Sequence, residues 1–148
     1  MSRAVNWLSS DVRNSSYTLF TVHSQPIDPE RNTEYVAQFE ALAEAIAAKA
    51  NIPNFAITYR SAGGQGQWLS PDVKEAIRTL HDKGHKGFVT CELLSLCADI
   101  ESYFEIGEEC QEVCDELGVE FAQAEFPADS YDTVIALAQI VEEHLKKI

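Results

Sequence analysis

The stretch from residue 18 to residue 26, TLFTVHSQP, decides much of the fold. Its first five residues are β-branched, aliphatic or aromatic, a composition typical of a β-strand. The strand pattern ends at His23, and the polar residues and Pro26 that follow indicate a tight turn. We therefore expect a buried strand that carries a histidine at its carboxyl end.

Working outward, strand-like apolar runs alternate with helical patterns along the rest of the chain. The expected strands are 17–22, 55–59, 87–92 and 119–122, and the expected helices are 34–50, 70–83, 99–116 and 129–146. This alternation predicts an α/β fold, a single three-layer domain in which helices cover both faces of a four-stranded parallel sheet. Ligands of such folds gather beyond the carboxyl ends of the strands.

The ends of the chain and the turns complete this division. Residues 1–16 are polar and mixed, so we expect a leader or linker outside the core, followed by one domain over 17–148. Residues 28–33 have turn chemistry, and Ser70-Pro71 is a helix-start signal. The glycine-rich segment 63–66 lacks the lysine and hydroxyl residue of a phosphate loop, and no dinucleotide fingerprint follows the first strand. We expect no prosthetic group.

Charge narrows the possible partners. The 148 residues carry a formal net charge of −13, which argues against nucleic acid and against an anionic membrane surface. No apolar run reaches the roughly 18–20 residues of a membrane span, and no signal-peptide pattern opens the chain. The cytoplasm is the expected compartment.

A ladder of carboxylates follows the third expected strand, in the segment 97–109, CADIESYFEIGEE. Glu101, Glu105 and Glu108 are spaced to share one helix face, and Glu109 lies close to it. Like charges at these spacings repel, and a bound cation would relieve the repulsion. A solvated acidic face is the alternative.

His23 has two interpretations as well. A histidine after a strand is commonly a structural hydrogen-bonding group, but in its neutral form it also accepts a proton or binds a divalent ion. Imidazole together with carboxylate suits iron, zinc or nickel better than calcium or magnesium.

The four cysteines, at 91, 97, 110 and 114, include no Cys-x-x-Cys pair, so a zinc ribbon is not expected. Cys110 and Cys114 share a helix face. They are either half of a metal site or, the reading we favour, buried free thiols.

From Tyr17 to Lys146 the chain resembles the carboxy-terminal half of ferrochelatase, of the coproporphyrin type found in Gram-positive bacteria. The matching segments are the strand that ends in His23-Ser24 with Pro26, Tyr59-Arg60-Ser61, the QWLSP element at 67–71, Gly87-Phe88-Val89, and Ile100-Glu101 through Cys110. The resemblance implies a chelatase-like fold and the insertion of ferrous iron into a porphyrin, a lyase reaction of haem biosynthesis.

The resemblance also assigns residues. The active-site histidine of the family falls on His23 and its active-site glutamate on Glu101, both toward the metal. The carboxylates one and two turns further along the helix fall on Glu105 and Glu109. Ferrous iron and porphyrin are then substrates rather than cofactors.

This chain departs from the family pattern at several positions. Glu92 stands where the family has proline, and Cys97-Ala98-Asp99 replaces a Ser-Asp-His run that would orient the glutamate. An apolar residue is usual where Gln25 stands. The amino-terminal domain, which supplies about half of the porphyrin cleft in the family, has no counterpart in these 148 residues.

Three interpretations therefore stay open. The chain is half of a chelatase that works with a separate partner domain; or a small homodimeric chelatase of the class II kind, in which two copies build the cleft; or a non-catalytic domain that binds tetrapyrrole or metal.

Overall fold

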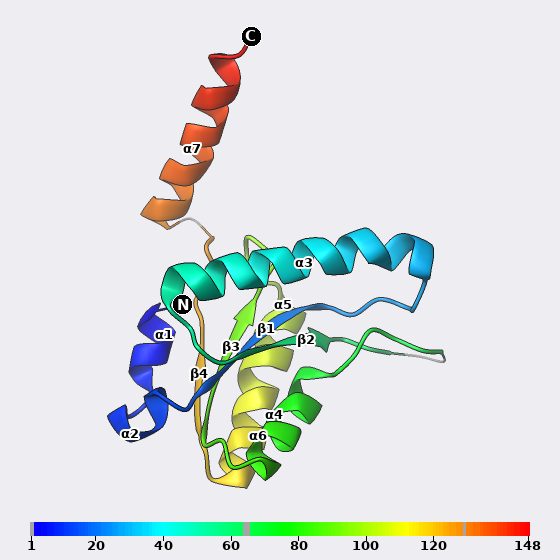
Figure 1. The fold of residues 1–148 in the computed structure, drawn as a ribbon, viewed down its shortest axis with the longest axis vertical. Coiled ribbons are helices and arrows are strands. Elements are labelled where there is room, and N and C mark those ends of the chain that lie inside the picture. Colours follow the sequence, from blue (N-terminus) through cyan, green and yellow to red (C-terminus); the bar gives the residue numbers. More distant parts are fainter. Residues whose placement is uncertain (1, 64–65, 129) are drawn as a thin grey trace.

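A computed structural model describes residues 2–63, 66–128 and 130–148 (Figure 1). The elements in chain order are α1 (Ser2–Trp7), α2 (Ser10–Arg13), β1 (Tyr17–His23), α3 (Pro29–Ala50), β2 (Phe55–Arg60), α4 (Val73–Asp82), β3 (Gly87–Glu92), α5 (Ile100–Tyr103), the π-helical turn η1 (Phe104–Glu108), α6 (Glu109–Leu117), β4 (Glu120–Gln123) and α7 (Tyr131–Leu145).

The four strands form one parallel sheet in the order β2-β1-β3-β4, which confirms the expected α/β fold. The central strand β1 therefore has β2 on one side and β3 on the other. In the register of the sheet His23 pairs with Arg60, and Thr21 pairs with Glu92. The carboxyl ends of three strands thus meet at one edge.

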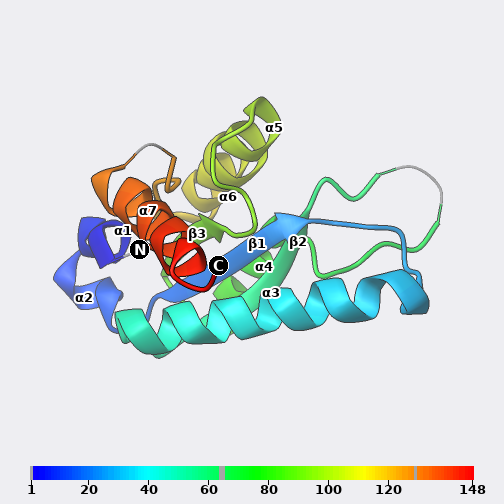
Figure 2. The same ribbon diagram turned by 90° about the horizontal axis from the view of Figure 1, so that it is seen from above.

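Helices cover both faces of this sheet (Figure 1, Figure 2). On one face, Phe20 of β1 packs with Phe39 of α3 in a cluster that also includes residues of α1. On the other face, Leu19 of β1 packs with Ile77 of α4 and Cys110 of α6. Burying each large apolar side chain contributes about 1.5–3 kcal/mol, so these two layers supply most of the driving force for folding.

The first sixteen residues contribute to the folded core. Residues 2–13 form two short helices, and Ala4 and Leu8 of this segment are buried in the core. The expectation that residues 1–16 lie outside the core is therefore wrong. Ala4 and Leu8, with Val5 partly buried beside them, mark this packing, and a pattern of this length is too short for periodicity to reveal.

Two helix starts also differ from the expectation. The helix expected at 34 begins at Pro29, because Asp28 caps it by accepting hydrogen bonds from the backbone of Glu30 and Arg31. The helix expected at 70 begins at Val73, where the carboxylate of Asp72 accepts from the backbone of Lys74. In both cases aspartate is the cap.

The helix expected over 99–116 is interrupted by the π-helical turn η1. Tertiary contacts accompany the wider turn: Thr90 Oγ1 donates a hydrogen bond to the backbone oxygen of Ile106 at 2.8 Å. Gly107 lies so close to Gln123 that a Cβ there would be 2.6 Å from the amide oxygen. A π turn carries one extra residue, so it changes which glutamates share a face.

The last helix, α7, begins at Tyr131 with Ser130 as its cap, close to the expected 129, which lies outside the described residues. It stands clear of the body of the protein (Figure 1). None of its residues is buried, although many are apolar. No helix within the described residues is long and apolar enough to cross a membrane.

Candidate functional site

The carboxyl edge of the sheet gathers the residues of interest onto one face. Side chains alternate along a strand, and Leu19, on the same alternation as His23, packs against α4 and α6. Register partners on neighbouring strands share a face, so His23 and Arg60 belong to that face as well. The helical segment α5–η1–α6, which carries the carboxylate ladder, begins beside this edge.

His23 is the exposed last residue of β1. Its Nδ1 lies 2.7 Å from the backbone oxygen of Ser24, and its own backbone oxygen accepts a hydrogen bond from the Tyr35 hydroxyl at 2.8 Å. If Nδ1 donates to that carbonyl, the proton sits on Nδ1 and Nε2 is free to accept a proton or a metal ion.

Arg60 and Glu92 form a buried ion pair behind the histidine. The Arg60 Nε lies 3.0 and 2.9 Å from the two carboxylate oxygens, and each side chain is at most 3% exposed. Burial raises the pKa of Glu92, although its bonds to Arg60 act in the opposite direction. Burial acts to lower the pKa of Arg60, but the bonds and charge of Glu92 more than offset this and raise it. Arg60 therefore stays charged.

The same guanidinium holds the start of α5. Arg60 Nη2 donates to Asp99 at 3.3 Å, and Nη1 lies 4.0 Å from a carboxylate oxygen of Glu101. Asp99 caps α5 through a reciprocal pair of hydrogen bonds with Ser102. These bonds, with a further contribution from Arg60, lower the pKa of Asp99. Arg60 and Asp99 thus fix the start of α5, the turn that carries Glu101.

The rest of the ladder is paired too. Ser61 Oγ donates to Glu105 at 2.6 Å, and Lys74 Nζ forms an ion pair with Glu109. Glu101, Glu105 and Glu109 therefore follow one another along the side that faces Arg60, Ser61 and Lys74. Glu108 lies elsewhere, on the wall of a separate groove. The expectation that Glu108 shares the face of Glu101 and Glu105 is wrong, because the π turn shifts the repeat.

These partners bear on metal binding. The repulsion expected along the ladder is relieved by one arginine, one lysine and a hydroxyl. Within the described ranges, no group of three or more histidine, cysteine or carboxylate residues is close enough to hold a metal ion. Cys91, Cys110 and Cys114 are buried free thiols.

Exposed apolar side chains surround this edge. They lie in the loops and first helical turns that follow β1 and β3, and they are Ile27, Leu94, Leu96, Ile100, Tyr103 and Phe104. Ile100, next to Glu101, is 88% exposed. Apolar surface of this kind is typical of a ligand or partner contact.

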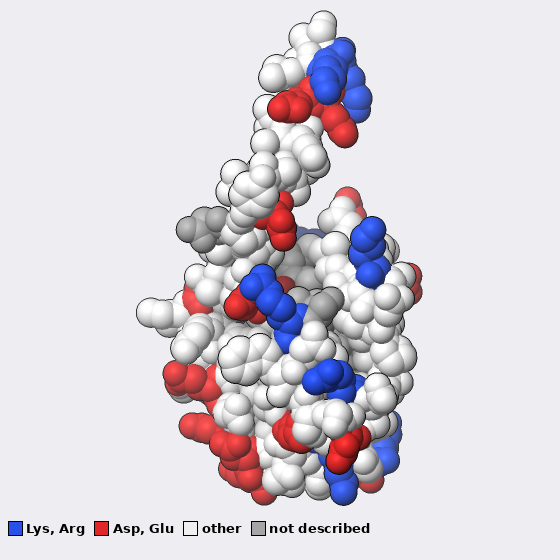
Figure 3. Space-filling model, turned by 90° about the vertical axis from the view of Figure 1, so that its left-hand side faces the viewer, with Lys and Arg blue, Asp and Glu red and all other residues white. Residues whose placement is uncertain are grey.

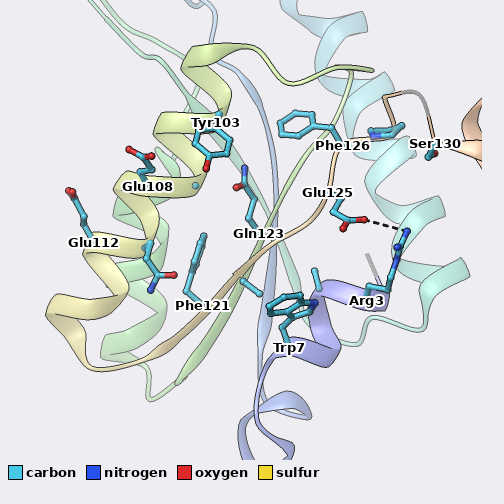
Figure 4. Close-up of a pocket in the computed structure, with 15 residues that line it drawn as sticks. Arg3, Trp7, Tyr103, Glu108, Glu112, Phe121, Gln123, Glu125, Phe126 and Ser130 are labelled. Carbon is cyan, nitrogen blue, oxygen red and sulfur yellow. Dashed lines mark ion pairs between the residues drawn. The ribbon is translucent and has the colours of Figure 1, made fainter.

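A groove of about 780 Å³ lies beside the edge, between α1, β4 and the segment α5–η1–α6 (Figure 4). Its walls carry Trp7, Tyr103, Phe121 and Phe126, and the ion pair of Arg3 with Glu125 lies within it. Neither His23 nor Glu101 lines it.

The sequence led us to propose His23, Glu101, Glu105 and Glu109 as site residues, which stays a prediction, and gave no functional weight to Arg60, Ser61 or Lys74. One signal was available. A charged residue ends each of two buried strands, an arginine at 60 and a glutamate at 92, and buried charges of opposite sign occur in pairs.

Comparison with known proteins places the chain. The family model described as Ferrochelatase matches residues 3–145, so the chain belongs to the ferrochelatase family. It is 33% identical over 141 residues to a ferrochelatase of Thermus thermophilus and 30% identical over 146 residues to coproporphyrin III ferrochelatase 2 of Bacillus cereus. Each match covers 93% of this chain but 44% of the relative. The chain thus spans less than half the length of these relatives.

A solved structure shares the fold. The cobalamin (vitamin B12) biosynthesis CbiX protein of Marinobacter aquaeolei superposes with a TM-score of 0.66 at 20% identity. The match covers 90% of this chain and 99% of that one. A polypeptide of similar size therefore adopts the same α/β fold.

Proposed function

We propose that this chain is one half of a chelatase site that inserts ferrous iron into a porphyrin, and that a second domain or subunit completes it. The observation that carries the proposal is the grouping of His23, Arg60 and the carboxylates of the segment α5–η1–α6 at one face of the sheet edge. Membership of the ferrochelatase family supports the choice of substrates.

In this reaction two pyrrole protons leave while iron sheds water and enters the ring. A neutral His23 accepts a proton at Nε2, because its other nitrogen, Nδ1, bonds to the backbone carbonyl of Ser24. Glu101, positioned by Arg60, faces the same reaction zone, while Glu105 and Glu109 provide a polar route for cations and protons. The exposed apolar residues near Ile100 contact one side of the macrocycle.

Titration of the purified chain with coproporphyrin III and protoporphyrin IX, followed by the Soret band, tests binding, and adding ferrous iron anaerobically tests insertion. We expect His23→Ala to lower insertion by at least about 100-fold, as loss of an acid-base group commonly does. His85→Ala is the matched control, since that residue lies between α4 and β3, at the end of the sheet opposite to this edge. Equal insertion by both variants would reject the role of His23.

A second candidate is a non-catalytic domain that binds tetrapyrrole or metal. The pairing of Glu101 and Glu109 with basic side chains favours it, because neutralised carboxylates attract a cation less. A Soret shift with no insertion under any condition, including a verified dimer, would select this candidate.

A further inference from the structure

We infer that α7 is an exchange arm: the α7 helix of one copy of this chain docks into the groove between α1 and α6 of a second copy, and the second copy docks likewise in return. This inference concerns assembly, and it names a second copy of the chain as the partner that the proposed function requires.

The apolar face of α7 has the spacing of a helix that packs on other helices. Its residues alternate three and four positions apart, and they are Tyr131, Val134, Ala138, Val141 and Leu145; Ile148 continues the spacing just beyond the end of the helix. All are exposed, with Val141 at 57% and Leu145 at 63%. An apolar stripe of this period forms a helix–helix seam, and monomeric proteins rarely leave such a stripe in water.

The groove offers a matching surface. Trp7 of α1 is 84% exposed and Tyr103 is 57% exposed, so apolar groups on the groove walls also face solvent. Figure 3 shows α7 standing clear of the body, uncharged over most of its length. Glu108 and Glu112 on the groove wall and Lys146 and Lys147 just beyond α7 carry opposite charges. Reciprocal docking of a second copy removes both the apolar face of α7 and the apolar wall of the groove from water.

The position of both surfaces favours reciprocal exchange. Pro127 and Ser130, just before α7, line the groove, so the helix leaves from the mouth of its own groove. In a two-fold dimer each arm then crosses to an equivalent mouth, which closes the assembly. The apolar face of α7 and the 15 residues that line the groove together give each partner about 20 contact residues, the lower end of the range for stable interfaces.

Exchange through α7 would also place the second copy over the proposed site. The backbone amide of Ala128, before α7, donates to the oxygen of Leu96 at 2.6 Å, so the arm is anchored to the loop after β3. That loop borders the edge with His23 and Glu101. Each copy matches 44% of a curated relative, so two copies approach the length of one two-domain ferrochelatase.

The test measures mass, independently of porphyrin. Light scattering on the eluting full chain should give about twice 16.5 kDa. Val141→Glu with Leu145→Glu should raise the dimer dissociation constant at least about tenfold, because it would bury charge without a partner. Ala136→Glu, away from the stripe on α7, is the matched control and should leave the dimer intact. Because α7 buries no residue in its own body, circular dichroism should show a folded chain throughout.

Cross-linking separates exchange from other dimers. Both copies carry Cys97→Ser. One copy, lengthened by a tag, also carries Leu137→Cys, and the other, without the tag, carries Trp7→Cys. Oxidation of the mixture should form a disulfide between the tagged and the untagged copy. A monomer at every concentration, a dimer indifferent to the α7 substitutions, or oxidation that leaves the two kinds of copy unlinked would each overturn the inference. A dimer that fails to insert iron would leave the exchange standing and reject only the proposed function.

Discussion

Arg60 and Glu92 bond to each other across the central strand, because their strands β2 and β3 lie on opposite sides of β1. In the register of the sheet Arg60 is level with His23, and Glu92 is level with Thr21. The pair therefore bridges the end of the strand that carries the histidine, and its free guanidinium nitrogens reach Asp99 and Glu101.

The first prediction concerns the stability of this pair. Glu92→Gln leaves a buried guanidinium without its counter-charge and should lower the free energy of unfolding by about 3–5 kcal/mol. In a double-mutant cycle, Arg60→Met with Glu92→Met should cost much less than the sum of Arg60→Met alone and Glu92→Met alone, because no buried charge remains in the double variant. Urea denaturation of the two single variants and the double variant gives the coupling energy.

An exposed pair provides the control. Arg78 and Glu116 bond at 3.1 Å on the surface, with side chains 51% and 65% exposed. The same cycle there should give a coupling below about 1 kcal/mol. Additive effects at Arg60 and Glu92 would show that the two side chains do not act as a pair.

The second prediction is a pH dependence at the start of α5. Asp99 has a lowered pKa in the folded protein, chiefly because the Ser102 backbone donates to it. A lowered pKa stabilises the fold above the ordinary value of 3.8, and this contribution is lost as the pH falls. Asp99→Ala should cost about 1 kcal/mol near neutrality, the usual value of a cap.

Unfolding measured between pH 7 and pH 3 checks this. The gap between wild type and Asp99→Ala should narrow as the pH falls below about 4. Ser130→Ala removes a cap from α7 that does not titrate, so any gap it causes should not follow that curve. A constant gap for Asp99→Ala would contradict the assignment.

Some of this arrangement could be predicted from sequence and some could not. The four strands were predictable because buried parallel strands are short apolar runs, and TLFTV at 18–22 is such a run. Glu101 was predictable from its place after the third strand and from the family resemblance. The roles of Arg60 and Lys74 depend on which side chains the folded helices bring near, and no local pattern records that. The π turn likewise depends on Thr90 and Gln123, residues of other elements.

The third prediction concerns the thiols. Burial raises the pKa of Cys91 to about 11 and that of Cys114 to about 12, and it raises the pKa of Cys110 as well. Cys97 is exposed. Because only the thiolate reacts, brief iodoacetamide treatment at pH 7.5 should add one group, at Cys97, to the native chain.

Mass spectrometry after proteolysis locates the adduct. In denaturant all four cysteines should react, which shows that burial protects the other three. Rapid labelling of Cys110 or Cys114 in the native chain would mean that the layer between α4 and α6 opens.

The last prediction tests whether Arg60 limits cation binding at the carboxylates. The positive charge of Arg60, 4.0 Å from Glu101, repels a divalent cation that approaches this carboxylate; for scale, two unit charges 4 Å apart interact by about 1–4 kcal/mol in surroundings between water and a protein surface. Arg60→Gln with Glu92→Gln removes the charge and its buried partner together, so no buried ion is left alone. Calorimetric titration with Mn²⁺ should then show affinity raised at least about fivefold over wild type.

Adding Glu105→Gln to the double variant should reverse the gain in Mn²⁺ affinity, because it removes a carboxylate from the same face. Arg78→Gln with Glu116→Gln makes the same charge change near the carboxyl end of α6, away from Glu101, and should leave Mn²⁺ affinity unchanged. If both double variants bind Mn²⁺ like wild type, the carboxylate ladder is a solvated acidic face and the guanidinium beside it has only a structural part.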